Sequence, residues 1–272
     1  MTWLHTVVFG LVQGLTEFLP ISSSAHLRIV AALFGWSDPG AAFTAVTQLG
    51  TETAVLVYFR RDLWAIATTW TKSLARPALR SEPEARLGWY VIIGTIPIAL
   101  LGVLFQDTIE TALRDLRLIA ISLIVFGLIL GAADRVAKNR QTLDQLTTPH
   151  ALVFGAAQAL ALIPGVSRSG GTITAGLLLG YRREDAARYS FLLAVPAVLA
   201  SGLLELTKIG SDTSAQWSST LVATLIAFVV GYLTIGWLLR YISTHHFTGF
   251  VIYRITLGVA VIALVQFGVI QP

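Results

Sequence analysis

A polar island, Pro164-Gly165-Val166-Ser167-Arg168-Ser169-Gly170-Gly171-Thr172, separates two apolar stretches of the chain. A guanidinium at the centre of a bilayer costs about 2.5 to 3.5 kcal/mol on insertion scales, so it normally faces a partner, an aqueous cavity or an anionic ligand. We therefore expect Arg168 to belong to a functional site.

The composition indicates an integral membrane protein. Hydrophobic residues make up 55% of the 272 residues and charged residues only 12%, and apolar runs of membrane-spanning length recur throughout. No polar stretch is long enough for a separate soluble domain, so we expect the membrane body to be the whole protein. Cysteine is absent, which excludes disulfides and thiolate metal sites.

Six segments are long enough to cross a bilayer: 41–60, 88–105, 117–135, 185–206, 217–240 and 248–269. Two more apolar segments, 2–35 and 150–181, are each broken near the middle by a proline and a serine cluster. We expect an all-α protein with six transmembrane helices and two re-entrant helix hairpins. Two proline-kinked through-helices are the simpler alternative, but the clustered hydroxyls at each break favour the hairpins.

The two broken segments resemble each other. Phe9, Gly10, Gln13, Leu15 and Pro20 match Phe154, Gly155, Gln158, Leu160 and Pro164, with an offset of one residue before the proline. Three crossings follow each hairpin, so the chain divides into repeats 1–149 and 150–272, and an odd number of crossings inverts the second repeat. Folds of this kind place broken helices and their binding sites near the midplane.

Basic residues separate cleanly under this topology. One face carries three, Arg114, Arg117 and Lys208, and three more lie within segments, Arg28, Arg168 and Arg254. The opposite face carries thirteen: Arg60, Arg61, Lys72, Arg76, Arg80, Arg86, Arg135, Lys138, Arg140, Arg182, Arg183, Arg188 and Arg240. The positive-inside rule makes the basic face cytoplasmic and places both termini outside.

The first hairpin brings candidate chemistry close together in sequence. Gln13 and Glu17 are four residues apart and share one helix face. Glu17 is expected to be neutral, paired with Arg168, or bound to a metal. Ser22, Ser23, Ser24 and His26 then supply hydroxyl groups, a helix cap and a proton shuttle.

The second hairpin completes an anion site. Ser167, Arg168, Ser169 and Thr172 open a helix whose glycines allow a ligand to approach the backbone. Two helix N-termini, an arginine and several hydroxyls favour a phosphate or diphosphate. Structural explanations remain open: the serines as caps, His26 as a hydrogen-bonded core residue, and Glu17 with Arg168 as a buried ion pair. Glu205 lies near a segment end, and Glu52 has no assigned role.

Over nearly its full length the chain resembles the bacterial undecaprenyl-diphosphate phosphatases of the bacitracin-resistance type. The resemblance rests on residues 13–20 with Ser22, Ser23 and His26, and on Pro164, Gly165, Ser167, Arg168, Ser169 and Thr172; residues 48–50 and 190–196 also look like family sequence. It implies hydrolysis of undecaprenyl diphosphate at the outer side of the bacterial plasma membrane, which regenerates the lipid carrier for cell-wall synthesis.

The resemblance also implies roles for individual residues. Ser23 would be a nucleophile or phosphate ligand, Glu17 a metal-binding or acid/base group, His26 a proton-transfer group, and Arg168 a clamp on the diphosphate. Gln13, Ser22, Ser167, Ser169 and Thr172 would complete substrate binding. A divalent cation is implied as cofactor, Mg²⁺ or alternatively Ca²⁺, and the expected partners are the prenyl diphosphate and membrane lipids, without nucleic acid; a homodimer stays open.

Two positions depart from the family pattern. Gln13 stands where many relatives have glutamate, which weakens the metal assignment, and Ala25 stands where glycine is usual. The residues leave open whether catalysis passes through a phosphoserine or direct attack by water. The competing class is a transporter that flips a prenyl phosphate, because inverted repeats with a midplane anion site are also the architecture of secondary carriers.

Overall fold

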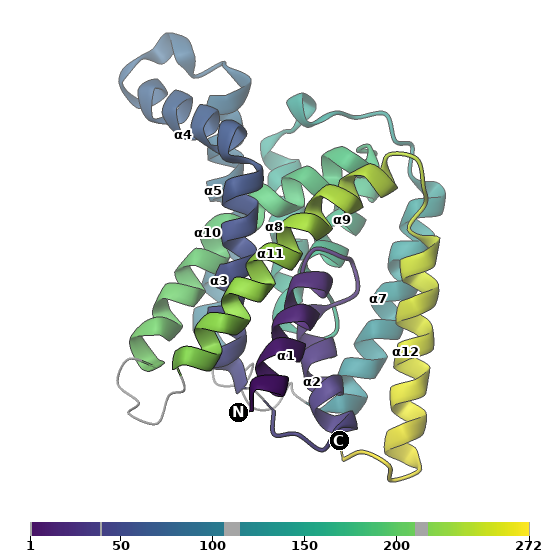
Figure 1. Ribbon diagram of the computed structural model, residues 1–272. Coiled ribbons are helices and arrows are strands. Elements are labelled where there is room, and N and C mark those ends of the chain that lie inside the picture. The colour runs from purple at the N-terminus through teal and green to yellow at the C-terminus, as the bar shows by residue number, and fades with distance from the viewer. Residues whose placement is uncertain (1, 39, 106–114, 210–216, 272) are drawn as a thin grey trace.

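The computed structural model describes residues 2–38, 40–105, 115–209 and 217–271, and is built from helices (Figure 1). β-pairing in these residues is limited to one isolated bridge between Gln141 and Tyr181. The α-helices are α1 Trp3–Thr16, α2 Ser23–Leu33, α3 Gly40–Tyr58, α4 Arg60–Ala75, α5 Pro83–Leu104, α7 Leu116–Val136, α8 Thr148–Ala159, α9 Arg168–Leu178, α10 Arg183–Ile209, α11 Trp217–Ile242 and α12 Thr248–Gln266. Short 3-10 helices are η1 Pro77–Leu79, η3 Leu143–Gln145 and η4 Leu160–Leu162.

Five of the described helices are long and apolar enough to cross a membrane, so the chain is an all-α integral membrane protein. They are α5, α7, α11, α12 and the Arg183–Leu203 part of α10, and they coincide with five of the six predicted crossings. The sixth prediction, 41–60, coincides with α3, which is helical but is not among these five. Arg114 lies outside the described residues, as do the side chains of Glu205 and Lys208.

The predicted helix, break, helix pattern is confirmed in both hairpins. The hairpin helices contain 14, 11, 12 and 11 residues, so the longest measures about 21 Å against a hydrocarbon core of roughly 30 Å. In each hairpin, the end of the second helix lies beside the start of the first. The His5 and Trp36 rings meet at 4.1 Å between centroids, and His150 Nδ1 lies 2.8 Å from the Tyr181 hydroxyl.

The two hairpins correspond residue by residue at a spacing of 145 positions. Thr2 and Thr147 cap α1 and α8, each accepting from the backbone N–H three residues on at 3.4 Å. Ser22 and Ser167 cap α2 and α9 with φ angles of 74° and 72°, a region that non-glycine residues seldom occupy. The aromatic contacts of Phe9 with Trp36 and of Phe154 with Tyr181 also match.

Each hairpin packs against a long helix from the other half of the chain. The first helix of each hairpin makes this contact: α1 packs on α11, and α8 packs on α5. Glycines make these close approaches: a Cβ on Gly10 would lie 2.8 Å from the Ala223 carbonyl oxygen, and one on Gly155 would lie 2.4 Å from that of Gly94. Small residues at such crossings let two backbones approach closely within a membrane.

The basic loop expected between residues 60 and 88 contains a helix, α4, followed by η1. The helix α4 has Ser73 buried and Trp64 exposed, and it is not among the helices that are long and apolar enough to cross a membrane. Figure 1 shows α4 at the end of the molecule opposite both termini, together with the α7–α8 and α11–α12 connections. The basic loops predicted to share one face therefore lie at one end.

Arg254 of α12 joins the two hairpin breaks. Its side chain is fully buried, and Nη1 donates to the Pro20 carbonyl at 2.9 Å, while Nη2 donates to those of Gly165 and Val166 at 2.8 and 3.0 Å. Nε donates to the Leu123 carbonyl at 3.2 Å. Helix breaks free backbone carbonyls, and at membrane depth these must find partners within the protein. One guanidinium thus satisfies both breaks.

We expect Arg254→Met to lower the free energy of unfolding by more than about 3 kcal/mol, because four buried carbonyl bonds to a charged donor are lost together. Reversible SDS denaturation in mixed micelles measures the change. Arg240→Met, at an exposed position near the end of α11, is the matched control. Equal losses in the two variants would show that Arg254 does not hold the breaks together.

Candidate functional site

The carboxylate of Glu17 is the centre of a buried polar cluster where the two hairpin breaks meet. Its Oε1 accepts from Arg168 Nη2 at 2.6 Å. Its Oε2 accepts from Ser23 Oγ at 2.5 Å and from Gln13 Nε2 at 2.8 Å, with Gln48 Nε2 at 3.5 Å. The structure therefore brings Gln13, Glu17 and Ser23 of the first hairpin together with Arg168, which lies 151 residues after Glu17 along the chain.

Local structure explains why these side chains converge. Glu17 is the C-cap residue of α1, and Gln13 lies one helical turn before it on the same face. Ser23 and Arg168 are the first residues of α2 and α9. They occupy equivalent positions of the two hairpins, 145 residues apart. The positive φ of each capping serine turns the chain so that both first residues reach the same carboxylate.

The other hydroxyls predicted at the site bond within the protein. Ser169 Oγ donates to the Leu19 carbonyl at 3.1 Å, which links the second hairpin to the first break. Thr172 donates to the Arg168 carbonyl at 2.8 Å and shares a short hydrogen bond with Ser190 of α10. Ser22 caps α2, which confirms the alternative interpretation of this serine as a helix cap, and Ser167 caps α9 in the same way.

His26 is placed on the α12 side of the first hairpin. Its Nδ1 lies 2.7 Å from the Ser22 carbonyl oxygen and its Nε2 lies 2.7 Å from the Tyr253 hydroxyl. A carbonyl oxygen only accepts, so Nδ1 carries the proton and Nε2 accepts from Tyr253. The two rings are stacked at 5.6 Å. Both ring nitrogens are thus engaged outside the Glu17 cluster.

Several buried polar atoms around Glu17 have no hydrogen-bond partner in the part of the chain that the structure describes. They are Gln13 Oε1, Arg168 Nη1 and Glu52 Oε1. Leaving such an atom unpaired costs about 1 to 3 kcal/mol, and natural structures seldom tolerate it without a functional reason. The cluster therefore has unused capacity for both a cation and an anion.

The donor set fits a hard divalent cation held through few protein groups. Among the described residues, no group of three or more His, Asp or Glu side chains could hold a metal ion by itself. The Glu17 carboxylate and the unpaired Gln13 amide oxygen are oxygen ligands, the type that Mg²⁺ prefers, and Mg²⁺ commonly binds through one or two carboxylates together with substrate phosphates.

Sequence reasoning gave no role in the site to several residues that the structure places here. Gln48 and Glu52 come from α3, Ser190 from α10, and Tyr253 and Arg254 from α12. Intramembrane ionisable residues are functional candidates by default, and that rule alone singles out Glu52 and Arg254. Gln48, Ser190 and Tyr253 are ordinary polar residues in apolar helices and carry no such signal.

Comparison with known proteins gives a consistent result. The family model described as "Bacitracin resistance protein BacA" matches residues 6–260. A Frankia casuarinae protein named "Undecaprenyl-diphosphatase 2" is 59% identical over 285 residues, covering 100% of this chain and 98% of its own length. An "Undecaprenyl-diphosphatase" of Pseudarthrobacter chlorophenolicus is 59% identical over 276 residues, covering 100% of both chains.

We expect Glu17 and Arg168 to be energetically coupled by about 1 to 3 kcal/mol, because removing either partner leaves the other charge buried. A double-mutant cycle of Glu17→Gln, Arg168→Gln and their combination measures this coupling as unfolding free energies in mixed micelles. The double variant should lose less unfolding free energy than the sum of the losses in the two single variants. Additive losses would show that the 2.6 Å contact contributes no coupling.

Proposed function

We infer that this chain, which belongs to the bacitracin resistance protein BacA family, is an undecaprenyl-diphosphatase. It hydrolyses undecaprenyl diphosphate to undecaprenyl phosphate and inorganic phosphate. The product is the lipid carrier recycled for peptidoglycan synthesis, and its recycling accords with the bacitracin resistance in the family's name. The observation that carries this function is one buried carboxylate that holds both a serine hydroxyl and an arginine.

Ser23 and Glu17 have the geometry of a nucleophile and its base. The hydroxyl donates to Glu17 Oε2 at 2.5 Å, within the reach that general-base catalysis requires. In the covalent route, Glu17 takes the proton, Ser23 Oγ bonds to the terminal phosphorus, and the bond to the bridging oxygen breaks. Undecaprenyl phosphate leaves, and water then releases phosphate from the serine. In the direct route, Glu17 activates water and Ser23 hydrogen-bonds a phosphate oxygen.

Arg168 clamps the diphosphate. Its Nη2 bonds Glu17, while its Nη1 is buried and has no partner among the described residues. A guanidinium that is already in place stabilises charge on the transferring phosphoryl group without reorganising during the reaction. The adjoining N-terminus of α9, with the hydroxyls of Ser167, Ser169 and Thr172, supports binding of the phosphate oxygens.

His26 is proposed as a proton-transfer group, and it lies three residues after Ser23 on α2. The neutral ring accepts from Tyr253 and donates to the Ser22 carbonyl, which fixes its tautomer and orientation. Tyr253 is about half exposed, so the pair connects the first hairpin with the surface of α12. We assign it to proton exchange during turnover.

Mg²⁺ is the proposed cofactor, with Ca²⁺ as the alternative. Glu17 and the unpaired oxygen of Gln13 would hold it. When bound, the cation neutralises charge on the phosphate oxygens. The chain's own groups then orient the diphosphate, while the prenyl tail stays in lipid.

The two hairpins are proposed to be re-entrant, so that α3 and the five apolar helices alone make the six crossings. Three observations support this: the hairpin helices are shorter than a bilayer, their ends meet again through His5 with Trp36 and His150 with Tyr181, and their breaks are satisfied inside the protein. An exposed break within lipid would leave carbonyl groups unpaired.

The halves 1–149 and 150–272 are proposed to be inverted repeats. The 145-residue correspondence of caps and aromatic contacts supports this arrangement. Packing is also reciprocal, since α1 contacts α11 as α8 contacts α5, and α3 contacts α11 as α10 contacts α5. Two inverted hairpins that meet at their breaks place the site near the midplane.

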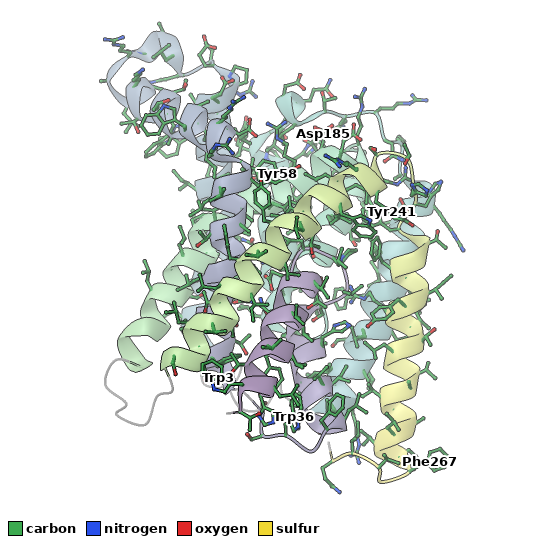
Figure 2. All side chains as sticks on the ribbon, in the orientation of Figure 1. Trp3, Trp36, Tyr58, Asp185, Tyr241 and Phe267 are labelled. Carbon is green, nitrogen blue, oxygen red and sulfur yellow. The ribbon has the colours of Figure 1, made fainter. Side chains whose placement is uncertain are left out.

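The protein is proposed to lie in the bacterial plasma membrane with the end that carries α4 in the cytoplasm. The basic connections at that end support this orientation, and both termini lie at the opposite end (Figure 1). The site is proposed to open towards the exterior. Figure 2 shows Trp3 and Trp36 near the end with the termini and Tyr58 and Tyr241 towards the other, as aromatic residues near two interfaces would lie.

A carrier that moves a prenyl phosphate is the alternative function, and the reciprocal packing of the two halves is the observation that favours it. It differs from the phosphatase in leaving the phosphoanhydride bond intact. Measurement of phosphate release therefore decides between the two functions.

We expect Arg168→Ala and Ser23→Ala each to lower phosphate release from undecaprenyl diphosphate at least about 100-fold, because one loses the preorganised charge and the other the group that contacts the phosphorus. The assay uses purified protein in detergent with Mg²⁺ and with a chelator. Thr53→Ala, at an exposed position on α3, is the control. Substrate binding without any phosphate release by the wild type would make the carrier the leading function.

The orientation has a separate test. Because the chain lacks cysteine, a single Ser37→Cys or Ser81→Cys variant carries one reactive thiol, and both positions are exposed. In intact cells, a membrane-impermeant maleimide should label residue 37 and should label residue 81 only after permeabilisation. The reverse pattern would invert the proposed orientation.

A further inference from the structure

Glu52 is an acidic group close to the site that has no role in the proposed reaction. It lies on α3, is 1% exposed, and comes one helical turn after Gln48. The Gln48 amide already reaches Glu17 Oε2 at 3.5 Å, and residues four apart lie on one helix face. Glu52 also interacts electrostatically with Arg168 and Glu17. Its carboxyl group therefore faces the same cluster.

The bonding of Glu52 points to a missing ligand. Its Oε1 is buried without a hydrogen-bond partner among the described residues. A carboxyl group buried for structural reasons would normally be hydrogen-bonded, because an unpaired polar atom in an apolar interior is costly. Gln13 Oε1 and Arg168 Nη1 are unpaired beside the same carboxylate. Two unpaired acceptor oxygens, Gln13 Oε1 and Glu52 Oε1, suit a cation that bonds to oxygen.

The net charge of the occupied site leads to the same conclusion. When ionised, Glu17 and Glu52 carry two negative charges, and Arg168 offsets one of them. A diphosphate bound at Arg168 would add at least two more negative charges to a buried pocket. Uncompensated charge in a low-dielectric site is strongly unfavourable. A divalent cation with oxygen ligands supplies the required charge.

We propose that Glu52 is the second protein carboxylate of a divalent-cation site shared with Glu17, contributed by α3. This inference rests on the proposed function for its phosphate ligand, but the cation site itself is built from the chain's own residues. It explains how the position next to Glu17 on α1 can be glutamine. Gln13 contributes a neutral oxygen there, and the negative charge comes from the adjacent helix.

The inference is tested by Mn²⁺ binding to the purified full chain, measured from the free-ion electron paramagnetic resonance signal without any lipid substrate. Three variants are compared with the wild type: Glu52→Gln, the swap Gln13→Glu with Glu52→Gln, and the control Glu82→Gln, which removes an exposed carboxylate. Loss of a supporting carboxylate typically weakens metal binding about 10-fold to 100-fold.

We expect Glu52→Gln to raise the Mn²⁺ Kd at least about tenfold, the swap to return it to within about threefold of the wild type, and Glu82→Gln to leave it unchanged. A Glu52→Gln variant that binds Mn²⁺ as tightly as the wild type overturns the inference. If Glu52→Gln does not fold, the swap decides, because a site that never used Glu52 would gain a carboxylate from Gln13→Glu. Affinity no tighter than that of the wild type supports the inference, and Mn²⁺ binding at least about tenfold tighter overturns it.

Phosphate release measured on the same samples separates this inference from the proposed function. Glu52-dependent Mn²⁺ binding in a wild-type protein that releases no phosphate would reject the phosphatase and keep the cation site. Phosphate release by a wild type whose Mn²⁺ affinity is insensitive to Glu52 would keep the phosphatase and reject the cation site.

Discussion

The structure depends on how two helix breaks within an apolar interior satisfy their backbone carbonyl groups. Arg254 does this for both breaks at once, through Pro20 on one side and Gly165 and Val166 on the other. Without water, these groups have no other source of hydrogen bonds. Because the same side chain contacts both breaks, it also sets the distance between them, and the separation of Glu17, Ser23 and Arg168 follows from that distance.

A nearly symmetric scaffold produces an asymmetric site. Ser23 and Arg168 occupy equivalent first positions of α2 and α9, and both bond to Glu17. One hairpin supplies a hydroxyl and the other a permanent positive charge. The residue equivalent to Glu17 in the second hairpin is Leu162, so the site holds one central carboxylate where strict symmetry would give two. Different residues at a few equivalent positions thus give the two hairpins distinct roles in one site.

Sequence reasoning recovered the features that are encoded locally. Proline, glycine and serine clusters identify the breaks, and the cost of burying charge directs attention to Glu17 and Arg168 as partners. It missed what depends on the packing of distant segments: Gln48 and Glu52 reach the cluster only because α3 packs against α10 and α11, and Arg254 meets the breaks only across more than 80 residues of chain. The helix α4 was missed because its amphipathic pattern is short and rich in charge.

The interlocking of the two halves has a consequence for synthesis of the protein. A ribosome delivers α1 to the membrane about 200 residues before α11, the helix that α1 packs against, has been made. During that interval the small-residue face with Gly10 lacks the helix that covers it, and Glu17 lacks the guanidinium of Arg168 until α9 has been made. The first hairpin must therefore stay mobile or be sheltered by the insertion machinery, and the site assembles only when the last third of the chain has entered the membrane.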